Sequence, residues 1–399
     1  MKILVVTNSC SKEMYKKVCE NRIKTIVEPQ QKFFRLIIDG LASVKNVDVD
    51  VMAALPVSAS TVKRYIFRAE EEKTISGVCY HYIPFLNGKI SRYFSLMFSA
   101  KIFSKKWCER KSNKDALIIV DPLVPMIAIP VRKMANKYGI KVVAIVTDLP
   151  KLSTKMKGRK EGWIKKTFLS LYQKIADKDL YLYDEYITLT ESINEVVNRQ
   201  KKPYIVIEGV ADSKDTKISK VHENYIMYAG GIYEKYGVKT LVEAFIRLNR
   251  KDVSLYIFGD GPYVNELKKK QKKHSNIKYM GCVTSDIVVE YEKRALLLVN
   301  PRPINEEFAK YSFPSKTMEY MLSGTAVVST RLLGIPDEYF NYIFAFDGDD
   351  IESVQKTLSD ILAYPKNKLK EKGELAHKFV LEEKNNIRMA EKIVNFMNR

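Results

Sequence analysis

The chain has 399 residues, which is more than a single hydrophobic core usually organises, and its hydrophobic content is 46%. This length predicts two domains of roughly 200 residues each. No run of about 18 apolar residues occurs, so no membrane-spanning helix is expected, and the first residues lack the features of a signal peptide. The five cysteines form no CxxC pair and the four histidines have no metal-ligand spacing, which argues against a zinc site and a disulfide scaffold.

Short apolar runs typical of β-strands alternate with amphipathic stretches typical of helices. In the first half, strands are expected at 2–6, 47–55, 116–120, 141–148, 185–190 and 204–209, with a helix at 30–44. In the second half, strands are expected at 225–230, 254–259, 277–281, 296–301 and 326–330, with helices at 235–249 and 263–274 and an all-helical region from 349. This alternation is typical of βαβ units, so the predicted fold class is α/β, with two doubly wound sheets in series.

A polar segment at 211–224 separates two strand patterns, and the domains are expected at 1–208 and 209–380. The formal net charge of +20 is unevenly distributed: residues 1–200 contain 35 Lys and Arg against 20 Asp and Glu, and residues 201–399 contain 32 against 27. A basic first half predicts an anionic partner. The candidates are nucleic acid, acidic lipid headgroups and a pyrophosphate-linked substrate.

Glycine-containing loops follow three predicted strands of the second half. Gly230 and Gly231 end the first of these strands, and Lys235 follows in the same loop. The sequence GDGP (259–262) follows the second strand, and Gly281 ends the third. Glycines let backbone N–H groups approach a phosphate closely, although an ordinary β–α turn explains the same residues.

The stretch FPSKTMEYM (313–321) begins as a loop and continues as a helix. A helix N-terminus has unpaired N–H groups and a partial positive charge, which suit an anion. Glu319, one turn into the helix, is an ordinary choice for this end, but Lys316 in the first turn is unfavourable. We therefore expect a bound anion beside Lys316, and the alternative is a well-capped helix without a ligand.

As a set, the GG(x)₃K loop, GDGP, Gly281 and NPRP…FPSKTMEYMLSGTAVVST resemble the donor-binding half of glycosyltransferase family 4, and EGVADS (208–213) is similar to its inter-domain hinge. The resemblance covers most of residues 180–399 and the first half more loosely. It implies the GT-B fold, in which two Rossmann-like domains face a cleft and a last helix, here about 380–399, returns to the first domain. The whole is most similar to bacterial enzymes that build capsular or exopolysaccharide repeat units.

The resemblance also implies roles for individual residues. Lys235 would hold the donor pyrophosphate above Gly230 and Gly231, and Glu319 would contact the ribose of the nucleotide. The other residues expected on the donor side are Gly259, Gly261, Gly281, Val283, Tyr311, Phe313, Pro314 and Ser315, of which Gly281 and Val283 fall where relatives hold the base.

Two positions depart from the family pattern. Tyr311 stands where the first glutamate of the Glu-x₇-Glu motif is expected, and no arginine near Gly231 accompanies Lys235. We hypothesise that Lys316 replaces this arginine. Glu306 or Glu307, in the preceding loop, is a candidate to serve the sugar hydroxyls in place of Tyr311.

The first half offers weaker candidates for the acceptor side. Thr147 and Asp148 end a predicted strand where relatives often have His-Asp facing the reacting centre, so only Asp148 is carried over. A strand-ending aspartate that caps the following loop is the alternative. Thr7, Asn8 and Ser9 follow the first strand and are small polar residues that suit a sugar acceptor.

Two basic segments, 89–114 and 153–174, interleave aromatic residues with lysine and arginine. Basic amphipathic helices with aromatic residues bind anionic membrane surfaces, so both segments are expected to contact the membrane. The alternative is that the aromatic residues belong to the core and that the lysines form a solvated face.

The predicted function is retaining transfer of a hexose from a nucleotide-diphosphate sugar, with UDP as the expected nucleotide, to a saccharide linked to polyprenyl diphosphate. Lys235, Lys316, Glu319 and Asp148 are the expected catalytic residues. The resemblance implies no metal and no cofactor, and we expect a cytoplasmic enzyme, peripheral on the membrane, without a nucleic-acid partner. The alternatives are a GT-B sugar-nucleotide 2-epimerase, for which four histidines are few, and a basic nucleic-acid- or membrane-binding protein without catalysis.

Overall fold

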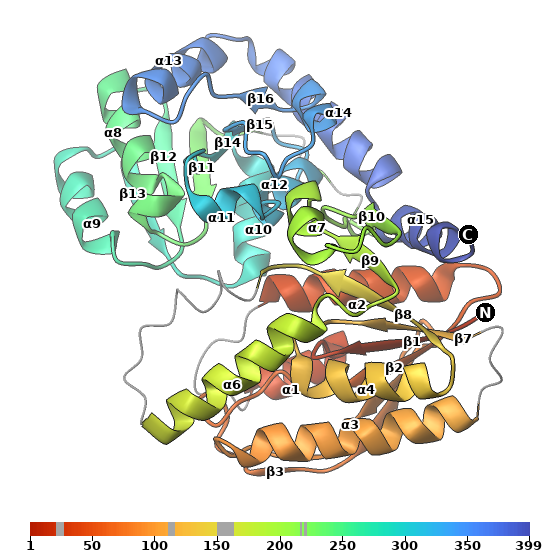
Figure 1. Cartoon of the computed structure of the whole chain (residues 1–399). Helices are drawn as coiled ribbons and strands as arrows, with labels where there is room; N and C mark the ends of the chain where they lie inside the picture. The colour runs from red at the N-terminus through yellow and green to blue at the C-terminus, as the bar shows by residue number, and fades with distance from the viewer. Residues whose placement is uncertain (21–27, 111–115, 150–162, 216–217, 219–221) are drawn as a thin grey trace. The chain divides into compact units, whose positions relative to one another are not determined.

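The computed structural model describes residues 1–20, 28–110, 116–149, 163–215, 218 and 222–399 (Figure 1). It divides into two compact units, Met1–Val210 with Asn386–Arg399, and Ala211–Asn385. Each unit is built on its own sheet of mainly parallel strands, which confirms the predicted α/β class with two doubly wound sheets. In the described part of the chain, no helix is both long and apolar enough to span a bilayer.

The sheet of the first unit has the strand order β10-β9-β8-β7-β1-β2-β5-β4. Its strands are β1 (Lys2–Thr7), β2 (Asp48–Ala53), β4 (Glu70–Lys73), β5 (Cys79–Tyr82), β7 (Ala116–Val120), β8 (Lys141–Val146), β9 (Glu185–Thr188) and β10 (Tyr204–Val206). All six strands expected in this half are present. The sequence did not predict β5, the antiparallel edge strand β4, or the separate pair β3 (Ile66–Phe67) and β6 (Phe85–Leu86).

Helices cover both faces of this sheet, with α2 on one face and α3 and α4 on the other (Figure 1). The helices are α1 (Lys12–Glu20), α2 (Glu28–Ser43), α3 (Ser91–Glu109), α4 (Pro125–Lys137), α6 (Trp163–Asp179), α7 (Glu191–Val197) and α15 (Asn386–Met397). Ile3, Leu4, Val5 and Val6 of β1 are all fully buried. Because alternate side chains of a strand face opposite sides, both faces of the sheet are covered, and each such side chain stabilises the fold by about 1.5–3 kcal/mol.

The last helix, α15, packs against α2 of the first unit. The two helices approach closely because Gly40 of α2 has no side chain: a Cβ there would lie 2.1 Å from the carbonyl oxygen of Asn386. The chain returns to the first unit at Asn386 rather than at about 380. The reason is that α14 (Lys366–Glu383) stays in the second unit, where Phe379 and Val380 are part of a buried cluster.

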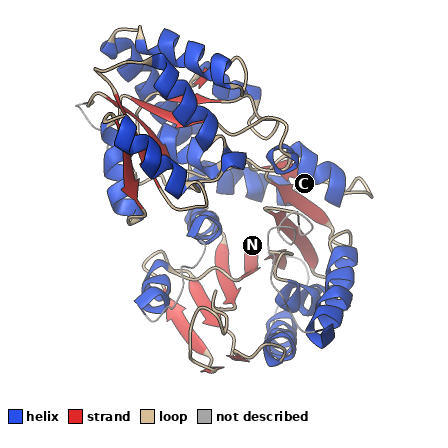
Figure 2. Ribbon diagram, turned by 90° about the vertical axis from the view of Figure 1, so that its left-hand side faces the viewer, coloured by secondary structure: helices blue, strands red, loops and turns tan. Residues whose placement is uncertain are grey.

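The second unit has a parallel sheet with the strand order β13-β12-β11-β14-β15-β16, flanked by helices (Figure 2). Its strands are β11 (Tyr225–Ala229), β12 (Ser254–Phe258), β13 (Ile277–Gly281), β14 (Leu297–Asn300), β15 (Val327–Ser329) and β16 (Phe344–Ala345). Its helices are α8 (Val238–Leu248), α9 (Val264–Lys273), α10 (Ser285–Arg294), α11 (Glu307–Lys310), α12 (Ser315–Leu322), α13 (Ile351–Leu362) and α14, with the 3₁₀ turns η1 (Glu234–Tyr236) and η2 (Asp337–Asn341). The five strands expected here are present, and β16 was not expected.

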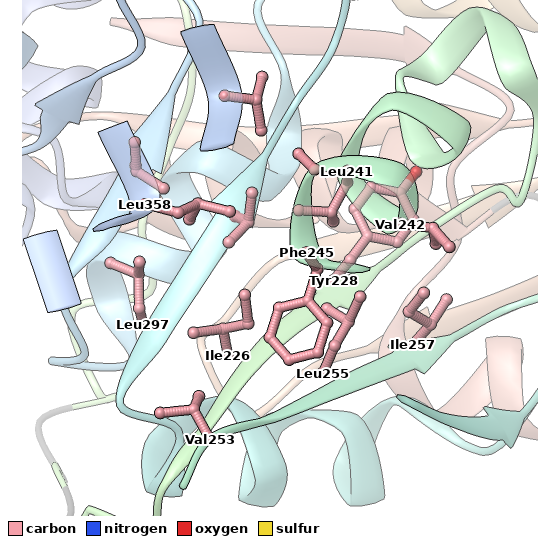
Figure 3. Packing of buried hydrophobic residues seen from close by; sticks show 14 of the residues in the cluster. Ile226, Tyr228, Leu241, Val242, Phe245, Val253, Leu255, Ile257, Leu297 and Leu358 are labelled. Carbon is pink, nitrogen blue, oxygen red and sulfur yellow. The ribbon is translucent and has the colours of Figure 1, made fainter. Parts of the chain in front are cut away.

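One core of the second unit lies between its sheet and α8 (Figure 3). Phe245 of α8 lies over Ile226 of β11 and Leu255 of β12, and α13 adds Leu358 to the same cluster (Figure 3). These residues are almost fully buried. The core fixes neighbouring strands side by side, and it therefore fixes the positions of the loops that leave their ends.

We expect Gly40→Ala to destabilise the first unit by about 1–3 kcal/mol, since the new methyl group overlaps the Asn386 carbonyl. The sign of the change in unfolding free energy is informative, because Gly→Ala in a helix interior without such a close contact stabilises a protein by about 1 kcal/mol. Urea unfolding followed by tryptophan fluorescence measures it, as both tryptophans, Trp107 and Trp163, belong to this unit. Lys133→Ala, at an exposed position of α4 in the same unit, is the control, and a stabilised Gly40→Ala protein would contradict the packing described here.

Candidate functional site

The loops that leave the carboxyl ends of β12, β11 and β14 lie at one edge of the second sheet, because these strands are parallel neighbours. Ligands of open α/β sheets bind at this edge. The sheet order brings the loop after Ala229 beside the loop after Asn300, although the two are far apart in the sequence. Most predicted donor-side residues lie in these loops or in the helices that follow them.

Backbone-to-backbone packing joins the β12 and β11 loops. Gly259 has a φ of 128°, and a Cβ on it would lie 1.8 Å from the carbonyl oxygen of Gly230. The amide of Gly230 donates to Phe258 and that of Ile232 donates to Asp260, at 3.0 and 2.9 Å. Packing between the loops therefore explains the GDGP glycines in the structure, and their contact with a donor stays a prediction.

The β11 loop also contacts the β14 loop. Its 3₁₀ turn ends at Gly237, whose φ is 78°, and a Cβ on Gly237 would lie 1.8 Å from the carbonyl oxygen of Pro301. Lys235 lies within this turn, with its Nζ 5.4 Å from the ring centroid of Tyr236 and 5.8 Å from that of Phe308. Among the described residues, no carboxylate forms an ion pair with Lys235.

Helix α12 is fixed to the end of β11 by a buried tyrosine. The Tyr320 hydroxyl accepts a hydrogen bond from the Ala229 amide at 2.8 Å and donates to the Ala229 carbonyl at 3.3 Å. Ala229 immediately precedes Gly230. The two predicted phosphate-binding segments, 230–237 and 313–319, are therefore neighbours in the structure.

Lys316, in the first turn of α12, forms ion pairs with two carboxylates of the chain. Its Nζ lies 2.7 Å from Oε2 of Glu319 and 3.5 Å from Oε1 of Glu292, a residue of α10 that is 1% exposed. Burial alone would lower the pKa of Lys316, but these carboxylates raise it above its ordinary value. The premise that this lysine needs a bound anion is therefore wrong, and its predicted role as the missing arginine stays untested.

Arg302 is a cation of this edge that the sequence analysis did not single out. It follows β14, and its Cζ lies 5.3 Å from the ring centroids of both Tyr236 and Phe308. Its Nη1 donates to the Ser312 hydroxyl at 3.4 Å, which is long for a hydrogen bond. Burial lowers the pKa of Arg302. The available signal was an arginine directly after a predicted strand, within the quoted NPRP motif.

The remaining donor-side candidates have different surroundings. Phe313 is buried, with its ring centroid 5.4 Å from that of Tyr339, so it packs the core beneath the loop. Ser315 is exposed at the first position of α12, after Pro314. Tyr311 is half-buried directly after α11, and Glu307, the first residue of α11, is exposed.

The edge above β13 is open in the structure. A Cβ on Gly281 would have no atom within 4 Å, and Val283 is exposed two residues later. This arrangement leaves room for the base that the resemblance assigns to these two residues, and the assignment stays a prediction.

In the first unit, the candidates for the acceptor side lie at the carboxyl ends of β1 and β8. Thr7 and Ser9 are fully buried, and the Ser9 hydroxyl donates to the carbonyl of Gln31 at 2.9 Å. The structure thus gives these two a role inside the unit, which does not support direct contact with an acceptor. Asn8 is partly exposed, and its Oδ1 is a buried acceptor without a partner among the described residues.

Asp148 and its neighbour Thr147 are half-buried after β8. The Asp148 carboxylate accepts a hydrogen bond from the Leu149 amide at 2.7 Å, as the loop-capping alternative expects, and burial raises its pKa. Asp121, which sequence analysis missed, follows β7 between these loops and is fully buried. Its carboxylate accepts from Gln30 and from the Leu123 amide, both at 3.0 Å.

Burial raises the pKa of Asp121 from an ordinary 3.8 to about 7. Between these values the folded chain keeps a proton that the unfolded chain has lost, so the stability of the first unit falls as pH rises, by about 4 kcal/mol at most. We expect Asp121→Asn to remove this slope between pH 4 and 7 in urea unfolding followed by tryptophan fluorescence. Glu195→Gln, at an exposed position of the same unit, should keep the slope. An unchanged slope in Asp121→Asn would refute the assignment.

Residues 223–363 match the protein family described as "Glycosyl transferases group 1". The match lies within the second unit and covers less than half of the chain. It includes Lys235, Arg302, Lys316 and Glu319 and does not extend into the first unit. No curated protein matches the chain.

Solved structures similar to the whole chain include sucrose-phosphate synthase from Thermosynechococcus elongatus (12% identity, TM-score 0.65), the lipopolysaccharide outer core galactosyltransferase WaaB (13%, 0.61) and HepE of Anabaena in complex with UDP (14%, 0.63). Each alignment covers 100% of this chain, and they cover 98%, 99% and 100% of the other chains. At these identities the likeness shows the fold. The chain has the GT-B fold, as expected, with two α/β units on parallel sheets.

Proposed function

We propose that the protein is a glycosyltransferase of the GT-B type that uses a nucleotide-diphosphate sugar as its donor. The observation that carries this proposal is Lys235, a cation without a carboxylate partner among the described residues, at the loop edge of a group 1 glycosyl transferase domain. The UDP in the HepE structure supports UDP as the first nucleotide to test. A hexose, retention of configuration and a lipid-linked saccharide acceptor are proposed from the family 4 resemblance.

In the proposed reaction, the bond between the anomeric carbon and a diphosphate oxygen breaks. The anomeric carbon bonds an acceptor oxygen, whose hydroxyl proton is lost, and the departing diphosphate gains negative charge. Fixed cations at the loop edge stabilise this charge without reorganisation at the moment of reaction. Glu319 is proposed to hold the ribose and Asp148 to serve the acceptor side. Among the described residues, no group of three or more His, Cys, Asp or Glu is placed to hold a metal ion, and metal independence stays a prediction of the resemblance.

A thermal-shift panel of nucleotide sugars and free nucleoside diphosphates, followed by calorimetry with the best ligand, tests the donor proposal. We expect Lys235→Gln to raise the Kd for UDP about 10-fold or more, because a hydrogen bond to a charged group contributes about 1.5–3 kcal/mol. Lys239→Gln is the matched control: it lies on α8 near the same turn, is exposed, and pairs with Glu234 at 3.2 Å. A wild-type protein that binds none of the nucleoside diphosphates would rule out the proposed function.

The 2-epimerase alternative makes a different product from the same donor. Incubation of the wild-type protein with the donor alone, followed by analysis of the sugar, separates the two activities. Appearance of the 2-epimer would favour the epimerase, whereas transfer to added saccharide acceptors would favour the transferase.

In the described part of segment 89–114, the evidence for membrane contact is the set of exposed apolar and basic side chains on α3. Phe98 and Ile102, four residues apart on α3, are 67% and 40% exposed, and Lys101 and Lys105 are exposed on the same helix. By contrast, Trp107 is buried and donates a hydrogen bond to Asp50 at 2.8 Å, so it belongs to the core as the alternative expects.

The second basic segment lies largely outside the described residues. Residues 150–162 contain four of its cations, Lys155, Lys157, Arg159 and Lys160, and the side chains of 163–169 are not described either. In its described remainder, Leu171 of α6 is 61% exposed. We propose that the exposed apolar residues of α3 insert into an anionic membrane while neighbouring lysines contact lipid headgroups.

Vesicle co-sedimentation tests this membrane contact. We expect the double variant Phe98→Ser/Ile102→Ser to bind vesicles of phosphatidylglycerol and phosphatidylcholine at least 10-fold less tightly, since complete burial of one such side chain contributes about 1.5–3 kcal/mol and about 1.4 kcal/mol is a factor of 10 in affinity. Ile75→Ser, at a fully exposed apolar position of the first unit outside α3, should bind like the wild type. Equal binding by all three proteins would exclude α3 as the contact.

A further inference from the structure

We propose that Arg302, rather than Lys316, is the second cation that binds the donor diphosphate, together with Lys235. This inference rests on the proposed function, since it names residues for the nucleotide-diphosphate donor. Arg302 would take the role that the family pattern gives to an arginine near Gly231, and it reaches the same edge of the sheet from β14, the strand beside β11.

Arg302 and Lys235 belong to one small cluster. Lys235 lies in the loop after β11 and Arg302 follows β14, and these two strands pair in parallel through Ile226–Leu297 and Met227–Leu298. The Arg302 Cζ and the Lys235 Nζ lie 5.3 and 5.4 Å from the same ring centroid, that of Tyr236. The ring of Phe308 is the second neighbour of both cations, at 5.3 and 5.8 Å.

The charges of this cluster are not balanced by the described part of the chain. In that part, neither Arg302 nor Lys235 forms an ion pair with a carboxylate, and the one side-chain hydrogen bond of the guanidinium is that to Ser312. A guanidinium has five N–H donors, and a largely desolvated cation without a counter-charge favours a bound anion. Lys316, in contrast, already has carboxylate partners at 2.7 and 3.5 Å.

The backbone of Arg302 is held in place before any ligand binds. It lies between Pro301 and Pro303, and its carbonyl accepts a hydrogen bond from the Thr330 hydroxyl at 2.6 Å. Pro301 in turn contacts Gly237, which ends the turn that contains Lys235. A fixed arginine can present two parallel N–H groups to phosphate oxygens, and a lysine supplies a single point charge beside it.

Calorimetry with UDP, GDP, ADP and inorganic pyrophosphate tests the proposal on the full chain. We expect Arg302→Gln to weaken binding of the best nucleotide and of pyrophosphate at least 10-fold, and Arg302→Lys to weaken it less. Lys316→Gln should change the affinity for pyrophosphate, which has no ribose to contact Glu319, less than 3-fold. Arg331→Gln is the matched control, because Arg331 is an exposed arginine of the same unit with its Cζ 4.5 Å from the ring centroid of Phe340.

Each outcome decides between the proposals. Nucleotide binding that survives in Arg302→Gln and Arg302→Lys, or pyrophosphate binding that falls more in Lys316→Gln than in Arg302→Gln, overturns the role of Arg302 and leaves the proposed function intact. Binding of pyrophosphate but of no nucleotide, lost in Arg302→Gln, supports the cation pair and removes the proposed function. A wild-type protein that binds neither overturns both. Circular dichroism spectra and melting temperatures close to wild type are required of each variant, and if Arg302→Gln does not fold, Arg302→Lys gives the decision.

Discussion

Close backbone packing between neighbouring loops is the constraint on which the site of the second unit depends. Gly259 lies against the Gly230 carbonyl, and Gly237 lies against the Pro301 carbonyl, so three strand-end loops form one continuous layer. A side chain at either glycine would separate the loops. At Gly237, which ends the turn that contains Lys235, this separation would move Lys235 away from Phe308 of α11. The hydrophobic core beneath fixes the positions of the strands, and close packing at the glycines fixes the loops that follow them.

Charge compensation divides the cations of this edge into two kinds. Lys316 forms ion pairs with carboxylates and joins α12 to α10, whereas Lys235 and Arg302 lie beside aromatic rings and form no ion pair with a carboxylate among the described residues. The apolar strand pattern followed by two glycines was enough to place Lys235 in the loop after β11, and its role at the donor stays a prediction. Of the two carboxylate partners of Lys316, Glu319 lies three residues away on the same helix, but Glu292 could not be found from the sequence because it lies on α10 and contacts Lys316 only in the folded unit. The surroundings of Arg302 could not be found from the sequence either, because Tyr236 comes from the loop after β11 and Phe308 from α11.

The fold was more predictable than the site because parallel strands buried on both faces are continuous apolar runs. The central strands β1, β7, β8, β11 and β14 have this character, and the fully buried Ile3–Val6 of β1 are an example. The strand β4 escaped prediction because its sequence, EEEK, is polar: it is an edge strand that pairs on one side only, with β5, and its side chains are mostly exposed. The two-residue strands β3, β6 and β16 are too short to show any periodicity.

The position of α15 has a consequence for the order in which the chain folds during synthesis. Helix α2 is made early, but the helix that covers its Gly40 face begins only at Asn386. At about 5–20 residues per second, a ribosome needs roughly 20 to 70 seconds to travel from one to the other. The second unit is contiguous and is complete before that point. The unit that begins first therefore receives α15 only after the second unit has been made, and until then α15 is not available to cover the Gly40 face of α2.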